Sequence, residues 1–177
     1  MTERMKELGF KEISPEQLDR NVFTAVGKQW MLITAGDESG SNTMTASWGG
    51  MGVLWNKNVA AAFIRHSRHT KSFVDAADSF TLSFYPEDCR KALAFCGSKS
   101  GRDFDTDGKA KAAGLTAMYL DGTVAYEEAE LVLVCRKLFT SDLAPEGFAD
   151  RSLLDAFYSD SDWHTAYIAE ITAVYSR

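Results

Sequence analysis

Residues 42–50 read Asn-Thr-Met-Thr-Ala-Ser-Trp-Gly-Gly, and the interpretation of the whole fold starts from this stretch. Thr43 and Thr45 alternate with Met44 and Ala46, which is the period of a β-strand. Small side chains and a glycine pair follow, where packing residues are expected. Small residues let the main chain approach a planar group, whose edge can bond to backbone N–H groups and hydroxyls. The stretch therefore indicates either a strand that ends in a glycine turn or one wall of a ligand site.

A second informative segment follows directly. The apolar run 59–64, Val-Ala-Ala-Ala-Phe-Ile, predicts a buried strand that ends in the basic turn 65–70, Arg-His-Ser-Arg-His-Thr. The apolar positions that come next fit a helix over 68–77 with Ser67 as its N-cap. A helix N-terminus offers free N–H groups and partial positive charge, and the turn adds two arginines and a threonine hydroxyl. The alternatives are a phosphate site and a solvated basic turn.

A third polar segment, 97–103, reads Gly-Ser-Lys-Ser-Gly-Arg-Asp and lies between two predicted helices. It does not match a P-loop, because the lysine comes before the second glycine instead of after it. ATP binding is therefore not supported. The loop supplies hydroxyl, lysine and arginine donors that suit an anion or a polyol chain, and it is equally compatible with an exposed surface loop.

Together and in this order, the three segments resemble the flavin reductase-like proteins with the FMN-binding split-barrel fold. The similarity rests on 44–50, 64–70 and 97–103, continues through 80–84, 113–116 and 163–171, and covers about residues 22–174. The resemblance implies one domain over residues 1–177. It also implies a mainly β fold with peripheral helices, namely a six-stranded antiparallel split β-barrel that is usually dimeric and holds FMN at the subunit interface.

The resemblance also implies the residues of the FMN site. Those expected along the isoalloxazine ring and ribityl chain are Thr45, Ala46, Ser47 and Trp48; those near the phosphate are Arg65, Arg68 and Thr70; those closing the other side are Ser98, Lys99, Ser100, Gly101 and Arg102. The chain departs from the family pattern at His69, where tyrosine is common, and at Ala169, where glycine is usual. The first departure puts one stacking or hydrogen-bond contact in question.

Composition agrees with a single enzyme-sized domain. The chain has 177 residues, 45% of them apolar, and a net charge of −6. A domain of this size buries about 70% of the surface of its unfolded chain. The acidic balance argues against nucleic-acid binding, which needs a basic face. No apolar stretch approaches the roughly 20 residues that cross a bilayer, and the charged start of the chain lacks a signal-peptide pattern. The sequence predicts a cytoplasmic protein without a membrane partner.

The hydrophobic pattern predicts more strand than helix. Strands are expected near 22–35, 43–54, 59–65, 79–84, 116–126, 130–140 and 165–175, and short helices near 14–19, 68–77, 87–96, 107–113 and 151–158. Helices do not alternate regularly with strands, so a doubly wound parallel sheet is not indicated. The dinucleotide motif Gly-x-Gly-x-x-Gly is also missing from the sequence. A nicotinamide cofactor would therefore bind as a substrate.

Cysteines and metal-ligand patterns give mainly structural interpretations. Cys89 and Cys96 share one face of a predicted helix and are too far apart for a disulfide, so buried free thiols are expected, with a redox relay from Cys96 as the alternative. Residues 103–108 begin like a calcium loop, but position twelve is Gly114 instead of glutamate. Asp107 is expected to cap the following helix. We predict no calcium, zinc or other metal site.

The sequence leaves two functions open. One is an FMN-dependent oxidoreductase that takes hydride from NADH or NADPH and reduces flavin or another small-molecule or protein acceptor. The other is an FMN carrier or flavoredoxin-like electron-transfer protein without such turnover. No catalytic residue is identified, and His164 is a weak candidate for proton transfer. Ser47 is not expected to be a nucleophile, because the segment around it lacks the first glycine of the hydrolase elbow.

Overall fold

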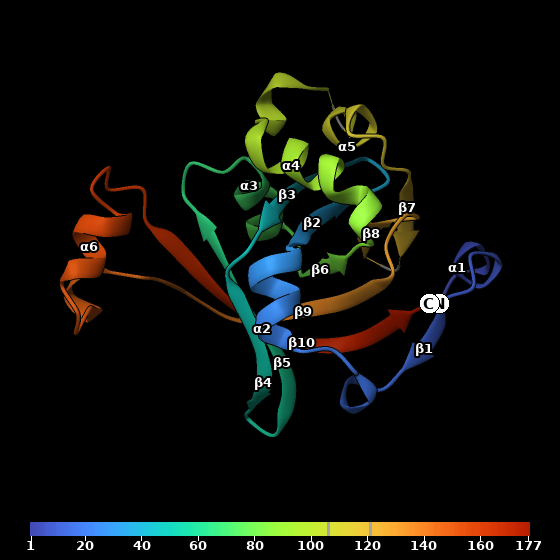
Figure 1. The fold of residues 1–177 in the computed structure, drawn as a ribbon, viewed down its shortest axis with the longest axis horizontal. Coiled ribbons are helices and arrows are strands. Elements are labelled where there is room, and N and C mark those ends of the chain that lie inside the picture. Colours follow the sequence, from blue (N-terminus) through green and yellow to red (C-terminus); the bar gives the residue numbers. More distant parts are fainter. Residues whose placement is uncertain (106, 121) are drawn as a thin grey trace.

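Antiparallel β-structure dominates the computed structural model, which describes residues 1–105, 107–120 and 122–177 (Figure 1). Eight of the described strands form one sheet in the order β3-β2-β6-β9-β10-β5-β4, with β1 paired to β10, and β7 and β8 form a separate hairpin. The strands are β1 (Lys11–Ile13), β2 (Met31–Asp37), β3 (Gly40–Ala46), β4 (Gly49–Leu54), β5 (Lys57–Arg65), β6 (Ser79–Phe84), β7 (Ala117–Leu120), β8 (Thr123–Tyr126), β9 (Leu131–Asp142) and β10 (His164–Ser176). The mainly β prediction is confirmed.

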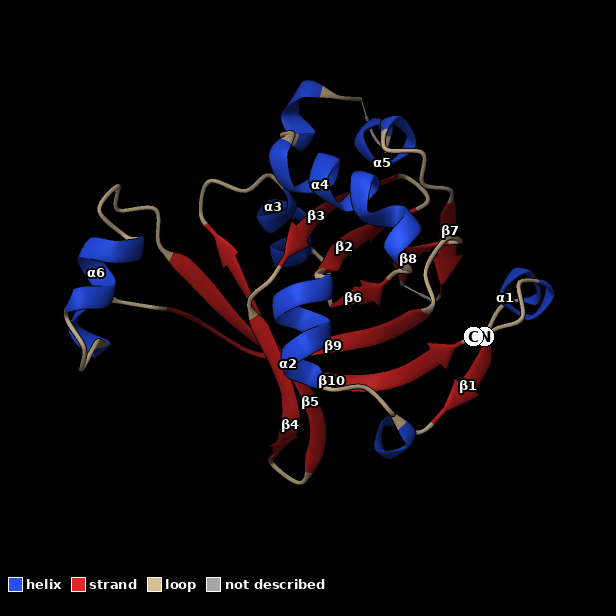
Figure 2. Ribbon diagram, in the orientation of Figure 1, coloured by secondary structure: helices blue, strands red, loops and turns tan. Residues whose placement is uncertain are grey.

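Short helices lie around the sheet (Figure 2). They are α1 (Glu3–Glu7), α2 (Val22–Thr24), α3 (Thr70–Ala76), α4 (Arg90–Ser98), α5 (Gly108–Ala112) and α6 (Ser152–Phe157), with a π-turn at Ala25–Gln29 and 3₁₀ turns at Pro15–Gln17, Glu87–Cys89, Gly101–Asp103 and Pro145–Gly147. Helices α3, α4 and α5 pack near β2 and β3. Among the described residues, no helix combines the length and the apolar character needed to span a membrane.

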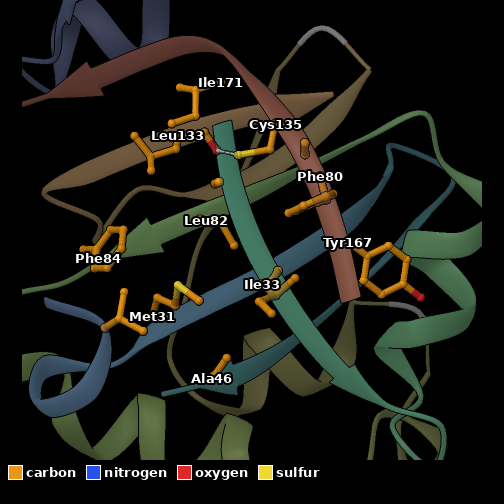
Figure 3. Packing of buried hydrophobic residues seen from close by; sticks show 14 of the residues in the cluster. Met31, Ile33, Ala46, Phe80, Leu82, Phe84, Leu133, Cys135, Tyr167 and Ile171 are labelled. Atoms are coloured by element: carbon orange, nitrogen blue, oxygen red, sulfur yellow. Dashed lines mark hydrogen bonds between the residues drawn. The ribbon is translucent and has the colours of Figure 1, made fainter. Parts of the chain in front are cut away.

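The sheet curls so that β5 crosses over β2 and β6, and apolar side chains fill the space between them (Figure 3). Strand period explains which side chains point inward: Phe80, Leu82 and Phe84 alternate along β6 and are all buried, as are Leu133 and Cys135 on β9. Each fully buried large apolar side chain contributes roughly 1.5 to 3 kcal/mol. The interior is thus a packed core, and a ligand has to bind at its edge.

A segment of 21 residues between β9 and β10, Leu143–Trp163, carries α6 and is called the arm below. The arm lies at one end of the molecule, and α1 and both chain termini lie at the other (Figure 1). Because β10 begins at His164, the arm leads directly into the strand that pairs with β5 at Arg65. This pairing brings the arm close to the basic turn.

Several predicted strands had wrong boundaries. The predicted strand 22–35 begins only at Met31, because the side chain of Asn21 accepts a hydrogen bond from the Thr24 N–H and starts a helical segment instead. The predicted strand 43–54 is divided into β3 and β4 at Ser47 and Trp48. The predicted strand 116–126 is the β7–β8 hairpin, and its residue Asp121 lies outside the described residues.

The helix predicted at 68–77 is present as α3, but Ser67 is not its N-cap. His69 occupies that position and makes no side-chain cap bond. The hydroxyl of Ser67 instead donates to a carboxylate oxygen of Asp162 in the arm, at 2.6 Å. As an N-cap, Ser67 would accept a hydrogen bond from a backbone N–H, whereas here its hydroxyl donates to an ionised carboxylate, which makes a stronger bond. The prediction of free cysteines is confirmed, with Cys96 and Cys135 buried.

Candidate functional site

Two clefts open where β3 ends, and Arg68 lines both of them. The first cleft, of about 220 Å³, is lined by Met44, Thr45, Ala46, Ser47, Trp48, Phe63, Arg65, Arg68 and His164. The second cleft, of about 210 Å³, is lined by Ser67, Arg68, His69, Thr70, Ser98, Lys99, Ser100, Gly101 and Lys109. Together they fall in the range of roughly 300 to 1,000 Å³ that is typical of small-molecule sites. The structure thus brings three sequence-distant segments together.

The wall of the first cleft is the end of β3. The ladder with β2 ends at Ala46, and the ladder with β5 starts at Gly49, so Ser47 and Trp48 lie outside both. Backbone groups outside a ladder need other partners, which a ligand can supply. The Thr45 hydroxyl is already used, because it donates to the Leu93 carbonyl of α4 at 2.5 Å. The main chain at Ser47, more than the Thr45 hydroxyl, is therefore the polar edge offered to a ligand.

Arg68 joins the two clefts and also holds the end of α4. Its Nη1 donates to the Gly97 carbonyl at 2.9 Å, and its Nη2 donates to the Cys96 carbonyl at 3.4 Å. A cation at a helix C-terminus satisfies carbonyls that the helix leaves open. Burial lowers the pKa of Arg68 below its ordinary value. The guanidinium is therefore a fixed positive charge between the clefts.

The loop 98–102 is anchored through Gly101. A Cβ on Gly101 would lie 2.1 Å from Nδ2 of Asn42, so only glycine fits against this side chain. Asn42 in turn accepts a hydrogen bond from the Thr70 hydroxyl at 2.8 Å. This contact ties β3, the start of α3 and the loop together. Arg102 donates to the Ser67 carbonyl at 2.9 Å and does not line either cleft, although the resemblance placed it at the ligand.

Lys109 of α5 is the functional candidate that the sequence did not reveal. Its side chain is only 3% exposed, and it lines the second cleft. Its ammonium makes no hydrogen bond or ion pair with any described residue, although buried charges are normally paired. Burial, with a smaller contribution from the Arg68 charge, lowers the pKa of Lys109 to about 8. An anion in the second cleft would provide the missing partner.

Arg65 lines the first cleft, but its donors are directed to the arm. Its Nη1 donates to the Asp162 carbonyl at 2.8 Å, and its Nη2 donates to the Phe157 carbonyl at 2.9 Å. The carboxylates of Asp160 and Asp162 lie 3.7 and 3.8 Å from Nη1. Its expected approach to a phosphate stays a prediction. In this structure the guanidinium connects β5 to the arm.

His164 and Trp48 form the aromatic part of the first cleft. Their ring centroids lie 5.0 Å apart, and Trp48 also makes an edge contact with Phe157 of the arm at 5.3 Å. Burial, followed by the nearby charge of Arg65, lowers the pKa of His164 to about 4. The imidazole is therefore neutral over the physiological pH range.

The remaining candidates lie outside the clefts or lack a ligand set. Burial raises the pKa of Cys96 to about 11, so its thiol is protonated and poorly suited to the proposed redox relay. Asp107 occupies the N-cap position of α5 without a side-chain cap bond, so the predicted cap is wrong; its carboxylate accepts instead from the Ser41 N–H at 2.8 Å. Of the candidate calcium loop, Thr106 lies outside the described residues. Elsewhere in residues 1–105, 107–120 and 122–177, no three metal-ligating side chains cluster.

The sequence matches the family model described as the flavin reductase like domain over residues 23–177. The chain belongs to the flavin reductase-like family. Membership confirms the predicted family and makes a flavin the ligand class of the fold. No curated protein matches the chain in sequence.

Solved structures of flavin reductase-like proteins share the fold at low sequence identity. An FMN-binding domain of a flavin reductases-like enzyme from Shewanella baltica superposes with a TM-score of 0.67 at 14% identity, covering 94% of this chain and 76% of that one. Flavoredoxin from Methanosarcina acetivorans gives 0.65 at 20% identity, covering 93% and 76%. A flavin reductase with a split-barrel domain from Shewanella frigidimarina gives 0.65 at 18% identity, covering 93% and 79%. The predicted split barrel is thereby confirmed.

Proposed function

We propose that this flavin reductase-like protein binds FMN and is an oxidoreductase that takes hydride from NADH or NADPH and reduces a small acceptor such as free flavin. The observation that supports this proposal is the pair of clefts that share Arg68, one with an aromatic and main-chain wall and one with a lysine whose side chain is buried. A flavin mononucleotide has the matching parts, namely a planar ring system, a hydroxylated chain and one terminal phosphate.

The described residues fit FMN at both ends. In the first cleft, Trp48 provides an aromatic side chain that is 42% exposed, and Ser47 provides main-chain groups outside the ladders. In the second cleft, the Lys109 side chain is largely buried, and its ammonium makes no hydrogen bond or ion pair with another described residue. A charge-assisted hydrogen bond between such an ammonium and a phosphate contributes roughly 1.5 to 3 kcal/mol. Lys109 therefore replaces Arg65 as the first candidate for the phosphate contact.

The residues of the chain would bind, orient and shield the FMN. FMN, when bound, supplies the hydride and electron chemistry. Arg68 keeps one positive charge fixed between the two clefts, where it would face a bound FMN, and Gly101 keeps the loop 98–102 against β3. Lys99 adds an exposed donor at the second cleft, and the Ser100 hydroxyl, which accepts from the Arg102 N–H, can still donate. The Ser98 hydroxyl already donates to the Phe95 carbonyl at 3.3 Å. Arg65 and the arm limit access to the first cleft from the side of Trp48.

Anaerobic reduction of the FMN-loaded protein tests the proposed activity. Addition of NADH or NADPH should bleach the flavin absorbance at about 450 nm within seconds, since typical turnover numbers are on the order of 10 per second. Dithionite reduction is the control for an intact, accessible flavin. Reduction by dithionite alone would contradict the reductase proposal and favour the electron carrier. Failure of the protein to bind FMN at all would contradict both.

We also propose the homodimer that the resemblance implies and the cytoplasmic location that the sequence pattern predicts. The β4–β5 hairpin exposes Val53, Leu54 and Trp55, and Phe139 of β9 lies beside Trp55 at 6.4 Å between ring centroids. Contiguous exposed apolar groups are common at protein interfaces. Sedimentation equilibrium should give twice the chain mass of 19.6 kDa, and Trp55→Ser should shift the equilibrium toward the monomer. A monomeric wild-type protein would contradict the dimer.

A further inference from the structure

A hydrogen bond between two buried side chains joins the arm to the first cleft. The hydroxyl of Tyr158, directly after α6, lies 2.9 Å from Nδ1 of His164. Both side chains are buried, with exposed fractions of 7% and 6%. His164 lines the first cleft, whereas Tyr158 does not. The hydroxyl of Tyr158 therefore acts on the cleft through His164.

The phenol of Tyr158 is held by neighbours on several sides. Its ring stacks on Trp163 with centroids 4.8 Å apart and planes 17° apart, and it makes an edge contact with Phe148 at 5.6 Å. The guanidinium carbon of Arg65 lies 5.5 Å from the ring centroid. Aromatic contacts of these kinds contribute roughly 0.5 to 1.5 kcal/mol each beyond area burial. The position of the hydroxyl is thus fixed by the arm, and so is its bond to His164.

The hydrogen bond has a preferred direction. A phenol is a stronger acid than the N–H of a neutral imidazole, so the phenol donates and Nδ1 accepts. The single ring proton of His164 is then on Nε2. Burial and the charge of Arg65 oppose protonation of the ring; Asp162 favours it, and His66 adds a smaller opposing charge. Among the described residues, Nε2 has no hydrogen-bond partner, so it remains available to a ligand in the first cleft.

An uncharged donor suits a reduced nicotinamide in particular. The carboxamide oxygen of nicotinamide accepts hydrogen bonds, and loss of hydride leaves its ring positively charged. A neutral Nε2–H can bind this oxygen in both states, whereas an imidazolium would oppose the developing charge. The opposite tautomer would present a lone pair to the carboxamide oxygen and repel it.

We propose that Tyr158 is a positioning residue that fixes His164 as the neutral Nε2–H tautomer, which gives the first cleft an uncharged donor for the carboxamide of the hydride-donating nicotinamide. This inference rests on the proposed reductase function and deepens it. It also assigns the arm a part in substrate binding that the resemblance did not imply.

Tyr158→Phe tests the inference, because it removes the hydroxyl and keeps the ring. Trp163→Phe is the matched control, because it alters the stacked ring and keeps the hydroxyl. The first measurement is nitrogen NMR of the imidazole rings in the FMN-loaded protein. The chain has only 3 histidines, so His66→Gln and His69→Gln complete the assignment. The wild type and Trp163→Phe should show His164 as the Nε2–H tautomer, and Tyr158→Phe should show a mixture.

The second measurement is anaerobic flavin reduction at varied NADH and NADPH concentrations, with FMN affinity measured in parallel. We expect Tyr158→Phe to lower the second-order rate constant about three- to ten-fold, as for one lost hydrogen bond, while FMN affinity changes less than two-fold. Trp163→Phe keeps both the hydroxyl and an aromatic ring against Tyr158, so both quantities should change less than two-fold. A purely structural role would change FMN affinity or both variants alike, and would leave the tautomer as it was.

Two results would overturn the inference while leaving the proposed function intact. One is an Nδ1–H tautomer of His164 in the wild type. The other is an unchanged reduction rate in Tyr158→Phe despite a changed tautomer. If the wild-type protein binds FMN but neither nicotinamide reduces it, the proposed function itself fails, and the role in nicotinamide binding fails with it.

Discussion

Each of the two clefts contains a cation, but the two cations differ in their hydrogen-bond partners. In the first cleft, the guanidinium of Arg65 is saturated by two carbonyls of the arm and has two carboxylates nearby. In the second cleft, Lys109 is buried deeper and has no described partner. A cation whose donors are already satisfied has little left for a ligand, whereas a buried and unpaired ammonium has much to gain. We infer that remaining hydrogen-bond capacity, more than charge, distinguishes the proposed phosphate ligand Lys109 from Arg65.

Substitution of Lys109 should have the largest effect. Lys109→Met keeps the length of the side chain and removes the charge, and we expect FMN affinity to fall about ten- to a hundred-fold, as for a lost charge-assisted bond. Fluorescence titration of the flavin-free protein measures this change. The free energy of unfolding should not fall, because methionine is easier to bury than an ammonium that has no partner among the described residues.

Lys111→Met is the matched control, since Lys111 lies on the same helix but is exposed. The control should bind FMN like the wild type. Equal losses in both variants would mean that the effect comes from net charge alone, and the special role of Lys109 would be refuted.

The pH dependence of binding should show the next largest effect. Without ligand, the pKa of Lys109 is lowered to about 8. Phosphate favours the charged form, so binding raises this pKa and takes up a proton above pH 8. FMN affinity should therefore be highest below pH 8, where Lys109 is charged before the ligand binds. It should fall as pH rises and become about ten-fold weaker at pH 9 than at pH 7. His164 does not contribute in this window, because its pKa is about 4.

The same titration in Lys109→Met separates this linkage from other titrations. The variant should bind weakly and show no loss of affinity between pH 7 and pH 9. If the variant keeps the wild-type pH profile, a different group titrates.

A smaller effect is expected at the loop 98–102, which lines the second cleft. Gly101→Ala would place a Cβ 2.1 Å from Nδ2 of Asn42. Overpacking of this kind costs about 1 to 3 kcal/mol, so Tm should fall by a few degrees and FMN affinity by about three- to ten-fold. Gly27→Ala is the control, because a Cβ there meets no atom within 4 Å. Thermal unfolding that gives equal Tm values for the two variants would show that the Asn42 contact is not tight.

The fold could be predicted from the sequence, because ordered motifs and strand periodicity are local signals. Phe80, Leu82 and Phe84 alternate in the sequence as they do in the core. The strand prediction for 22–29 is wrong because the apolar pattern of this segment is ambiguous. The cap bond that Asn21 accepts from the Thr24 N–H starts a helical segment there instead. Local patterns therefore fail where one side-chain contact outweighs a weak propensity.

The candidate site could be predicted only in outline. Arg65 and Arg68 lie three residues apart in one turn, and no sequence feature tells them apart. Their partners are carbonyls of the arm for one and of α4 for the other, which only the folded chain brings near. Lys109 is not among the predicted site residues, because α5 has only 5 residues. So short a helix shows no periodicity that would indicate which of its faces points inward.

The smallest effect on flavin binding is expected for Arg65, and measuring it tests most directly whether Arg65 or Lys109 contacts the phosphate. Arg65→Ala should change FMN affinity less than about three-fold, because its donors are saturated by the arm. Loss of two charge-assisted bonds should instead loosen residues 143–163, so limited proteolysis there should become about ten-fold faster. Arg136→Ala is the control, because it removes an exposed arginine of β9 that pairs with Glu170 of β10. It should leave cleavage of the arm unchanged. If Arg65→Ala instead weakens FMN binding as much as Lys109→Met, the hydrogen bonds from Arg65 to the arm must break when the ligand binds. Arg65 would then be the phosphate ligand that the family resemblance implied.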